Sequence, residues 1–198
     1  MRLYSYIVRY DIGFAPNPFH GRCTLATCKP GVRRTTSVGD WVAGVGARRR
    51  RDGHLVYAMQ VSEKLTFDEY WSDPRFQRKK PDRRGSLKYR YGDNIYHRDA
   101  AGEWGQADSR HSLDSGAPNP EHVAKDTKAN AVLVGERFTY WGKAAVAIPD
   151  ALRDWDGIDL GRPGRDHRWK PHGPEMIAAF VEWIDSLPTG CHGDPADW

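Results

Sequence analysis

Two runs, Val38-Gly39-Asp40-Trp41-Val42-Ala43-Gly44-Val45 and His54-Leu55-Val56-Tyr57-Ala58-Met59-Gln60-Val61, have the β-branched and aromatic content of strands. Between them stand four arginines and the pair Asp52-Gly53. Asp-Gly is a strong turn signal, because both residues tolerate the positive φ angles of a tight hairpin turn. The stretch therefore predicts a β-hairpin with a basic tip.

Further strands are expected on both sides of this hairpin. Upstream, Tyr4 to Tyr10 reads as a strand, and it is followed by a loop, Asp11 to Gly21, that holds two prolines and two glycines. An ordered loop of that length is more often functional than a linker. Downstream, the segments 131–134 and 137–141 are expected to be strands.

Three helices carry recognisable start signals. Thr66 can cap a short helix with acidic residues in its first turn, and Asn119-Pro120 supplies an N-cap and a first-turn proline for a helix to about Lys128. A C-terminal amphipathic helix is predicted from Pro174 onward, because apolar residues recur at spacings of three and four. These residues are Ile177, Phe180, Val181, Ile184 and Leu187.

Composition indicates one compact domain spanning residues 1–198, of class α+β. The chain has 198 residues, a net charge of +4, 8 Trp and 9 Tyr, so its core and any ligand site both draw on aromatic side chains. The N-terminus lacks the apolar run of a signal peptide, and three cysteines make no disulfide framework. We therefore expect a cytoplasmic protein with no membrane partner.

Basic residues gather at the hairpin tip and along residues 75–90, where Asp82 is the single acid. Such groups attract phosphates through counterion release, so nucleic acid is the expected partner, with DNA favoured. A solvated loop face is the alternative interpretation. The residues expected to hold phosphates are Arg48, Arg49, Arg50, Arg51, Arg78, Lys79, Lys80, Arg83 and Arg84.

Titratable side chains are dense between residues 93 and 126. His122 and Asp126 stand four apart on the predicted helix and so share one face. The group could run general acid–base catalysis, bind a metal, or serve only hydrogen bonding and capping. Its spacing matches no metalloenzyme motif, so neither a metal nor a cofactor is predicted. The catalytic candidates are Asp93, His97, His111, His122 and Asp126.

Five motifs stand out as a set: Val8-Arg9-Tyr10-Asp11, Gly13-Phe14-Ala15-Pro16-Asn17-Pro18-Phe19, Cys23-Thr24-Leu25-Ala26-Thr27-Cys28-Lys29-Pro30, Gly39-Asp40-Trp41 and Tyr91-Gly92-Asp93-Asn94-Ile95-Tyr96-His97. Together they resemble the nucleotide modification associated domain family, second type, and the likeness extends to the final Gly-Asp-Pro-Ala-Asp-Trp. The resemblance implies a bacterial or phage-type protein that works with base-modified DNA, as in phage defence. It carries over no catalytic residues.

The Gly39-Asp40-Trp41-Val42 strand, its turn and its return strand also resemble the core of PUA-like domains, including the EVE and YTH groups that read modified bases. We therefore expect a curved, partly closed mixed sheet with short flanking helices. The predicted function is recognition of a modified or flipped base in DNA or RNA, or binding of a nucleotide. The expected base pocket consists of Tyr10, Trp41, Asp93, Asn94, Tyr96, His97, His111, Ser112 and Trp141.

Two other functions are compatible with these residues. An enzyme acting on a nucleotide or base, such as a glycosylase, hydrolase or transferase, would use a carboxylate paired with a histidine. A protein-interaction module in a defence or modification system would show no salt-sensitive affinity for nucleic acid.

Overall fold

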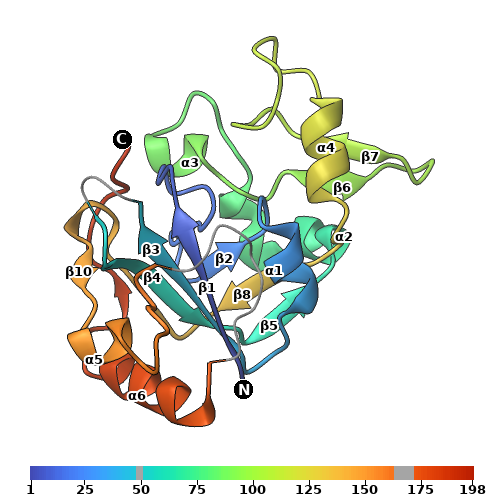
Figure 1. Ribbon diagram of the computed structural model, residues 1–198. Helices are drawn as coiled ribbons and strands as arrows, with labels where there is room; N and C mark the ends of the chain where they lie inside the picture. The colour runs from blue at the N-terminus through green and yellow to red at the C-terminus, as the bar shows by residue number, and fades with distance from the viewer. Residues whose placement is uncertain (48–50, 163–171) are drawn as a thin grey trace. The chain divides into compact units, whose positions relative to one another are not determined.

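The structure is a computed structural model that describes residues 1–47, 51–162 and 172–198 (Figure 1). Arg48, Arg49 and Arg50 of the predicted hairpin tip lie outside the described residues. The chain folds into two compact units. Unit 1 comprises Met1–Asp11, Thr36–Ser62 and Gly135–Trp198, and unit 2 comprises Ile12–Thr35 and Glu63–Val134.

Unit 1 is built on a mixed sheet that contains the predicted hairpin. Strands β3 (Trp41–Gly46) and β4 (His54–Gln60) pair antiparallel, which confirms the hairpin. Strand β1 (Leu3–Val8) lies parallel to β3, and β9 (Phe138–Tyr140) lies antiparallel to β4. Two short strands, β10 (Val146–Ala147) and β11 (Gly190–Cys191), pair with β4 and β9.

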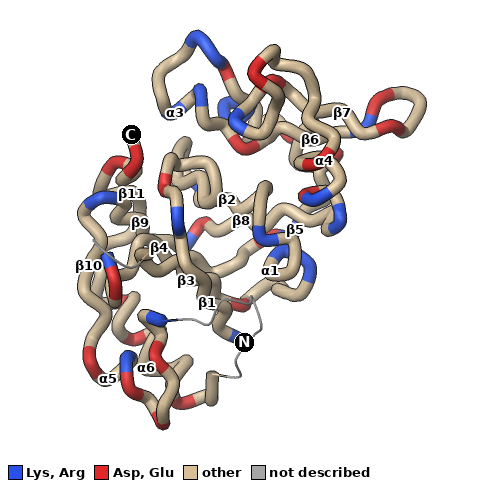
Figure 2. The backbone as a smooth tube through the Cα atoms, turned by 45° about the horizontal axis from the view of Figure 1, so that its top comes forward, with Lys and Arg blue, Asp and Glu red and all other residues tan. Residues whose placement is uncertain are grey.

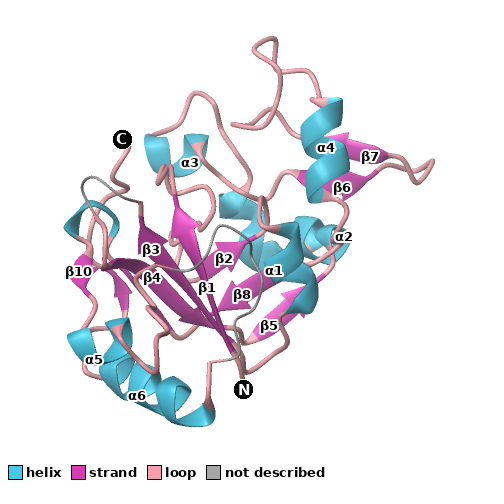
Figure 3. Ribbon diagram, in the orientation of Figure 1, coloured by secondary structure: helices cyan, strands magenta, loops and turns pink. Residues whose placement is uncertain are grey.

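The core of unit 1 lies between β3 and the last helix. Helix α6 (Pro174–Asp185) buries Met176, Phe180 and Ile184, and the rings of Phe180 and Trp41 meet edge to face at 5.7 Å. The short helices η2 (Gly142–Ala144) and α5 (Asp150–Arg153) complete this unit. Figure 3 shows how short most of these elements are beside the loops that join them.

Unit 2 combines two small sheets with short helices. Strands β2 (Cys23–Leu25), β8 (Val132–Gly135) and β5 (Glu63–Leu65) form one sheet in that order, and β6 (Tyr96–Arg98) and β7 (Trp104–Gln106) form a hairpin. The helices are α1 (Pro30–Thr35), α2 (Phe67–Ser72), η1 (Pro74–Lys79), α3 (Leu87–Arg90) and α4 (Pro120–Asp126). Thr66 and Glu69 form a capping box at the start of α2, as its sequence predicted.

The basic segment 75–90 is not a solvated loop along its whole length. The segment contains η1 and α3, and Phe76 is fully buried with its ring centre 4.7 Å from that of Tyr70. Asp73 caps η1 by accepting a hydrogen bond from the backbone of Arg75. One aromatic side chain thus anchors a segment whose charge suggested no core contact.

The mixed α+β class is confirmed, with several sheets and short helices. Within the described ranges no sheet closes into a barrel, and the PUA-like curvature stays a prediction. Among the same residues, no helix combines the length and the apolar content that crossing a bilayer requires.

Replacing Ile184 by Asp should unfold unit 1, because Ile184 is 5% exposed within its core and an unpaired buried carboxylate would cost about 4 kcal/mol or more. Glu182→Gln, an exposed position on the same helix, is the matched control and should unfold at the wild-type denaturant midpoint. Chemical denaturation followed by circular dichroism measures both. A wild-type unfolding midpoint for Ile184→Asp would contradict this packing.

Candidate active site

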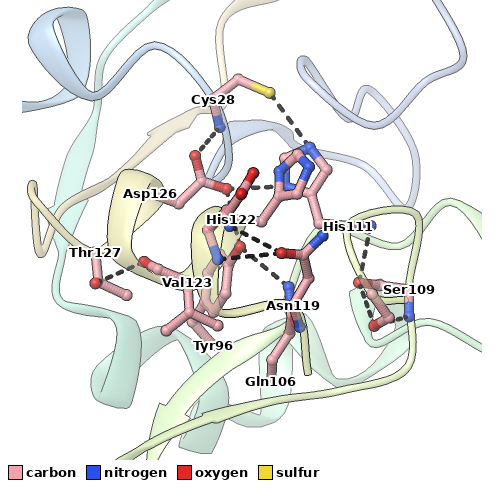
Figure 4. A network of polar contacts seen from close by, with 12 residues as sticks. Cys28, Tyr96, Gln106, Ser109, His111, Asn119, His122, Val123, Asp126 and Thr127 are labelled. Carbon is pink, nitrogen blue, oxygen red and sulfur yellow. Dashed lines mark hydrogen bonds and ion pairs between the residues drawn. The ribbon is translucent and has the colours of Figure 1, made fainter. Parts of the chain in front are cut away.

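Unit 2 places a thiol, an imidazole and a carboxylate in a row (Figure 4). The Sγ atom of Cys28 lies 3.7 Å from Nε2 of His111, and Nδ1 of His111 donates to Oδ2 of Asp126 at 2.9 Å. Asp126 is 1% exposed, and the His111 side chain is 11% exposed. The row is the order of groups that activates a cysteine nucleophile: thiol, base and orienting carboxylate.

Cys28 occupies a sharp turn between β2 and α1. Its φ angle is +57°, and that of Lys29 is +42°, which places two consecutive non-glycine residues in the left-handed region. That region disfavours residues with a Cβ atom, and such conformations cluster at functional sites. Pro30 then starts α1, since its fixed φ suits the first helical position. The turn holds the Cys28 backbone N–H at 2.9 Å from Oδ1 of Asp126, to which it donates.

Arg33, on α1, ties this turn to α4. Its Nε donates to the carbonyl oxygen of Cys28 at 2.8 Å, and its Nη2 donates to that of Asp126 at 2.6 Å. Its Nη1 donates to the carbonyl oxygens of Ala129 and Ala131, each at 2.7 Å. The side chain is completely buried, and burial lowers the pKa of Arg33 despite the opposing charge of Asp126.

Two serines form the turn that presents His111. The Ser112 hydroxyl accepts a hydrogen bond from the Ser109 backbone N–H at 3.0 Å and donates to the carbonyl of Ala107 at 3.1 Å. The Ser109 hydroxyl accepts from the His111 backbone N–H at 3.3 Å. Ser112, predicted to contact a base, therefore has its hydroxyl engaged in the turn.

Helix α4 supplies the carboxylate. Asn119 caps its start by accepting from the backbone N–H of Glu121 and His122, and Pro120 takes the first position, as its sequence predicted. Asp126, in the last turn, also accepts a hydrogen bond from the Tyr96 hydroxyl at 3.0 Å. His122 lies one turn before Asp126, and its ring centre is 4.1 Å from that of His111.

The charges of this group stabilise one another. Burial lowers the pKa of His111, but hydrogen bonds to Asp126 and Cys28 outweigh burial and raise that pKa to about 9. Burial raises the pKa of Asp126, but His111 and Arg33 more than offset it, so the Asp126 pKa lies below its ordinary value. Burial and the Asp126 carboxylate raise the pKa of Tyr96, which therefore stays a neutral donor.

Cys28, His111 and Asp126 are also residues of the types that bind metal ions. Among the described residues their potential ligand atoms all lie within 4.8 Å of one another. A metal on Asp126 would compete with the hydrogen bonds that Asp126 accepts from Cys28, His111 and Tyr96. Nucleophilic catalysis needs none of these bonds to break. The donor geometry therefore fits a thiol nucleophile better than a metal centre.

Asp93 and Asn94 have other partners than the histidines. The Asp93 carboxylate accepts from the Thr24 hydroxyl at 2.7 Å and from the Tyr70 hydroxyl at 2.8 Å. The Asn94 amide donates to the carbonyl of Tyr70, while its Oδ1 is buried with no hydrogen-bond partner in the described chain. Both side chains are completely buried.

The remaining members of the expected pocket are dispersed. The ring of His97 stacks on Trp71 at 4.0 Å, and Tyr96 is buried with its hydroxyl on Asp126. In unit 1, Trp41 is completely buried in the core, Tyr10 is 81% exposed, and Trp141 is half-buried beside His192.

Of the residues expected to hold phosphates, several have partners within the protein. Lys79 is 1% exposed, and its ammonium donates to the carbonyls of Asn17 and Arg22 and to the Asn17 side chain. Lys80 lies over the Trp71 ring at 3.7 Å. Arg83 pairs with Asp108, and Arg51, in unit 1, pairs with Asp11 and Asp197. Arg78 and Arg84 make no ion pair among the described residues.

The density of titratable residues predicted His111, His122 and Asp126 as candidates, whereas Cys28 and Arg33 were not predicted. Cys28 entered the sequence interpretation only as one of three cysteines and as part of a family motif. Cys28 could have been predicted from its place between a strand and a helix that begins with Pro30. Nucleophiles often occupy such strand–turn–helix junctions. Nothing local distinguishes the buried Arg33 from its exposed neighbour Arg34.

The folded protein should lose stability as pH rises through about 9, where His111 loses its proton. The raised pKa means that the His111 contribution is complete below about pH 6.5 and is lost at about pH 9, with an upper bound of about 3 kcal/mol. Urea unfolding of the wild-type protein and of His111→Gln at pH 6, 7.5 and 9.5 measures the contribution of His111 to the free energy of unfolding. The difference between the two proteins should shrink with rising pH, and a constant difference would contradict the ion pair.

Comparison with known proteins agrees with the motifs that the sequence presented. The model of the family described as nucleotide modification associated domain 2 matches residues 1–198, through both units, and no curated protein or solved structure matched the chain. That description connects the protein with nucleotide modification systems. The end-to-end match confirms the resemblance: the chain belongs to the nucleotide modification associated domain 2 family.

Proposed function

We propose that this protein is a nucleotide-modifying enzyme in which the Cys28 thiol attacks the substrate, His111 transfers the proton and Asp126 orients His111. The observation that carries the proposal is the continuous contact from Sγ through the imidazole to a buried carboxylate. The imidazole Nε2 lies 3.7 Å from the sulfur, within reach for proton exchange with the thiol, and the thiolate is the reactive form of cysteine.

The chemistry of a thiolate points to carbon as the atom attacked. The sulfur gives an electron pair to an electron-poor carbon of the base, and an S–C bond forms. The bond to a leaving group on that carbon, such as an amine, breaks, and the proton on His111 moves to the departing atom. Water then attacks the carbon and returns a proton to His111 while the S–C bond breaks. The thiolate and the protonated His111 are then restored, so the enzyme returns to its starting state.

Two further observations support this assignment. The left-handed backbone at Cys28 and Lys29 costs free energy, and the surrounding hydrogen bonds of Arg33 and Asp126 hold it in place. Such strain is common where a nucleophile must project from a turn. Membership of a family associated with nucleotide modification supports a nucleotide or base as the substrate.

Cys28 should react with iodoacetamide at pH 7 at least about tenfold faster than the exposed Cys191, because the adjacent His111 imidazole can exchange a proton with the Cys28 sulfur. Mass spectrometry of the two peptides gives both rates from one sample. His111→Gln and Asp126→Asn should each lower the Cys28 rate and leave the Cys191 rate unchanged.

Cys191 is the internal control, since it lies in unit 1. Circular dichroism melting establishes that each variant is folded. Equal rates at the two cysteines of the wild-type protein would contradict the proposal, and so would a Cys28 rate that does not depend on His111.

We propose further that unit 2 contacts nucleic acid, DNA being favoured, and that the base acted on or recognised is modified or flipped. The support is a set of exposed cations on η1 and α3 and between them that make no ion pair in the described chain: Arg78, Arg84, Lys88 and Arg90. In Figure 2, several blue stretches of the tube surround α3. Cations without carboxylate partners are available to phosphates.

Aromatic rings accompany these cations. Arg78 lies 5.8 Å from the ring centre of Tyr89, and Lys88 lies 5.5 Å from that of Phe19. His20 packs against Tyr89 at 5.0 Å. Burial, together with the charges of Lys79, Arg78 and Lys88, lowers the pKa of His20 to about 4, so the local potential is positive. Cations interleaved with rings suit a nucleic-acid backbone and its bases.

Affinity for an oligonucleotide should fall steeply with salt, and the double variant Arg78→Ser, Lys88→Ser should lower the slope of log affinity against log salt by about 2. Fluorescence anisotropy with labelled single- and double-stranded DNA between low and physiological salt measures the slope. Lys125→Ser, Lys128→Ser removes the same charge from exposed lysines elsewhere in unit 2 and should change the slope less.

An affinity that is independent of salt would overturn the nucleic-acid proposal. Equal losses in the two double variants would show that only net charge matters and would overturn the surface chosen here. The iodoacetamide experiment is unaffected by either result, because it contains no nucleic acid.

A further inference from the structure

Helix α4 presents two side chains to His111 rather than one. Asp126 holds the Nδ1 edge of the imidazole, and His122, four residues earlier, covers the ring with 4.1 Å between centres and 34° between planes (Figure 4). Residues four apart lie on one face of a helix, so a single element fixes both contacts.

Phe14 makes another ring contact with His111. The rings of Phe14 and His111 meet in a T-shaped arrangement, with centres 4.8 Å apart and planes at 71°. One hydrogen bond at Nδ1 leaves the imidazole able to tilt about the line to Asp126, and such a tilt would move Nε2 away from the sulfur of Cys28. Ring contacts from Phe14 and His122 oppose that tilt.

Burial and the charge of His111 favour the neutral form of the His122 ring. Burial lowers the pKa of His122, as do the charges of His111 and Lys125, whereas Asp126 and Glu121 oppose the shift. The neighbouring His111 has the opposite tendency, because Asp126 and Cys28 favour its charged form. A neutral aromatic ring attracts a cation that lies against it, while a second cation would repel it.

We propose that His122 is a positioning residue that holds the His111 imidazole in the plane in which its Nε2 meets the Cys28 thiol. This role rests on the proposed thiol mechanism and adds a residue to it. His122 acts through His111 and does not touch the sulfur.

Two substitutions separate ring contact from titration. His122→Phe keeps a neutral ring of similar breadth, and His122→Ala removes it. Lys125→Ala is the matched control, because Lys125 is an exposed cation on the same helix. The measured quantity is the rate of iodoacetamide reaction at Cys28 relative to Cys191 between pH 6 and 9, with melting temperature measured alongside.

His122→Ala should lower the relative rate about tenfold at pH 7, because a misplaced base is a poor partner for the thiol. His122→Phe should stay within about twofold of wild type across the pH range, and Lys125→Ala should match wild type. Recovery of the rate by Phe separates positioning from proton transfer by His122 itself.

A wild-type rate and pH profile in His122→Ala would overturn the role of His122. Equal losses in the folded Ala and Phe variants would also overturn it, because ring contact would then not be the cause. Equal rates at Cys28 and Cys191 in the wild-type protein would overturn the thiol mechanism itself. An enhanced wild-type rate that survives His122→Ala would overturn only the positioning role.

Discussion

The buried guanidinium of Arg33 holds together the parts of unit 2 on which the candidate site depends. It donates to four backbone carbonyls, those of Cys28, Asp126, Ala129 and Ala131. A buried cation is costly unless its donors are satisfied, and here the planar fork reaches the Cys28 turn, the end of α4 and the approach to β8. The left-handed backbone at Cys28 and the position of the Asp126 carboxylate are thereby set by the same side chain.

Sequence reasoning found the elements whose signals are local. The β3–β4 hairpin follows from Asp52-Gly53 between two apolar runs, and the starts of α2 and α4 follow from Thr66 and Asn119. It did not foresee that β1 lies parallel to β3, or β11 to β9. Parallel pairing joins residues far apart in the chain, so no turn chemistry marks it. The buried side of η1 was hidden because it consists of one apolar residue, Phe76, and a lysine, Lys79, a residue type that is usually exposed.

The sequence indicated which types of residue form the candidate site better than it indicated which individual residues come together there. His111, His122 and Asp126 were identified from local density, and the helix geometry placed two of them together. Asp93 and Asn94 belonged to the same sequence cluster, yet Asp93 bonds to Thr24 and Tyr70. The third side chain of the candidate site, Cys28, is 83 residues from His111 in sequence. The fold brings Cys28 and His111 together, and no local pattern in a single sequence predicts a contact between residues so far apart in the chain.

The division of the chain has a consequence for its synthesis. Unit 2 ends at Val134, whereas unit 1 needs β9, α6 and β11, the last of which ends at Cys191. A ribosome adds about 5 to 20 residues each second, so all residues of unit 2 exist seconds before the last strand of unit 1. Cys28, His111 and Asp126 can therefore meet while the N-terminal strand β1 still awaits its completed sheet. The candidate site would then be assembled on a nascent chain, while unit 1 is still incomplete.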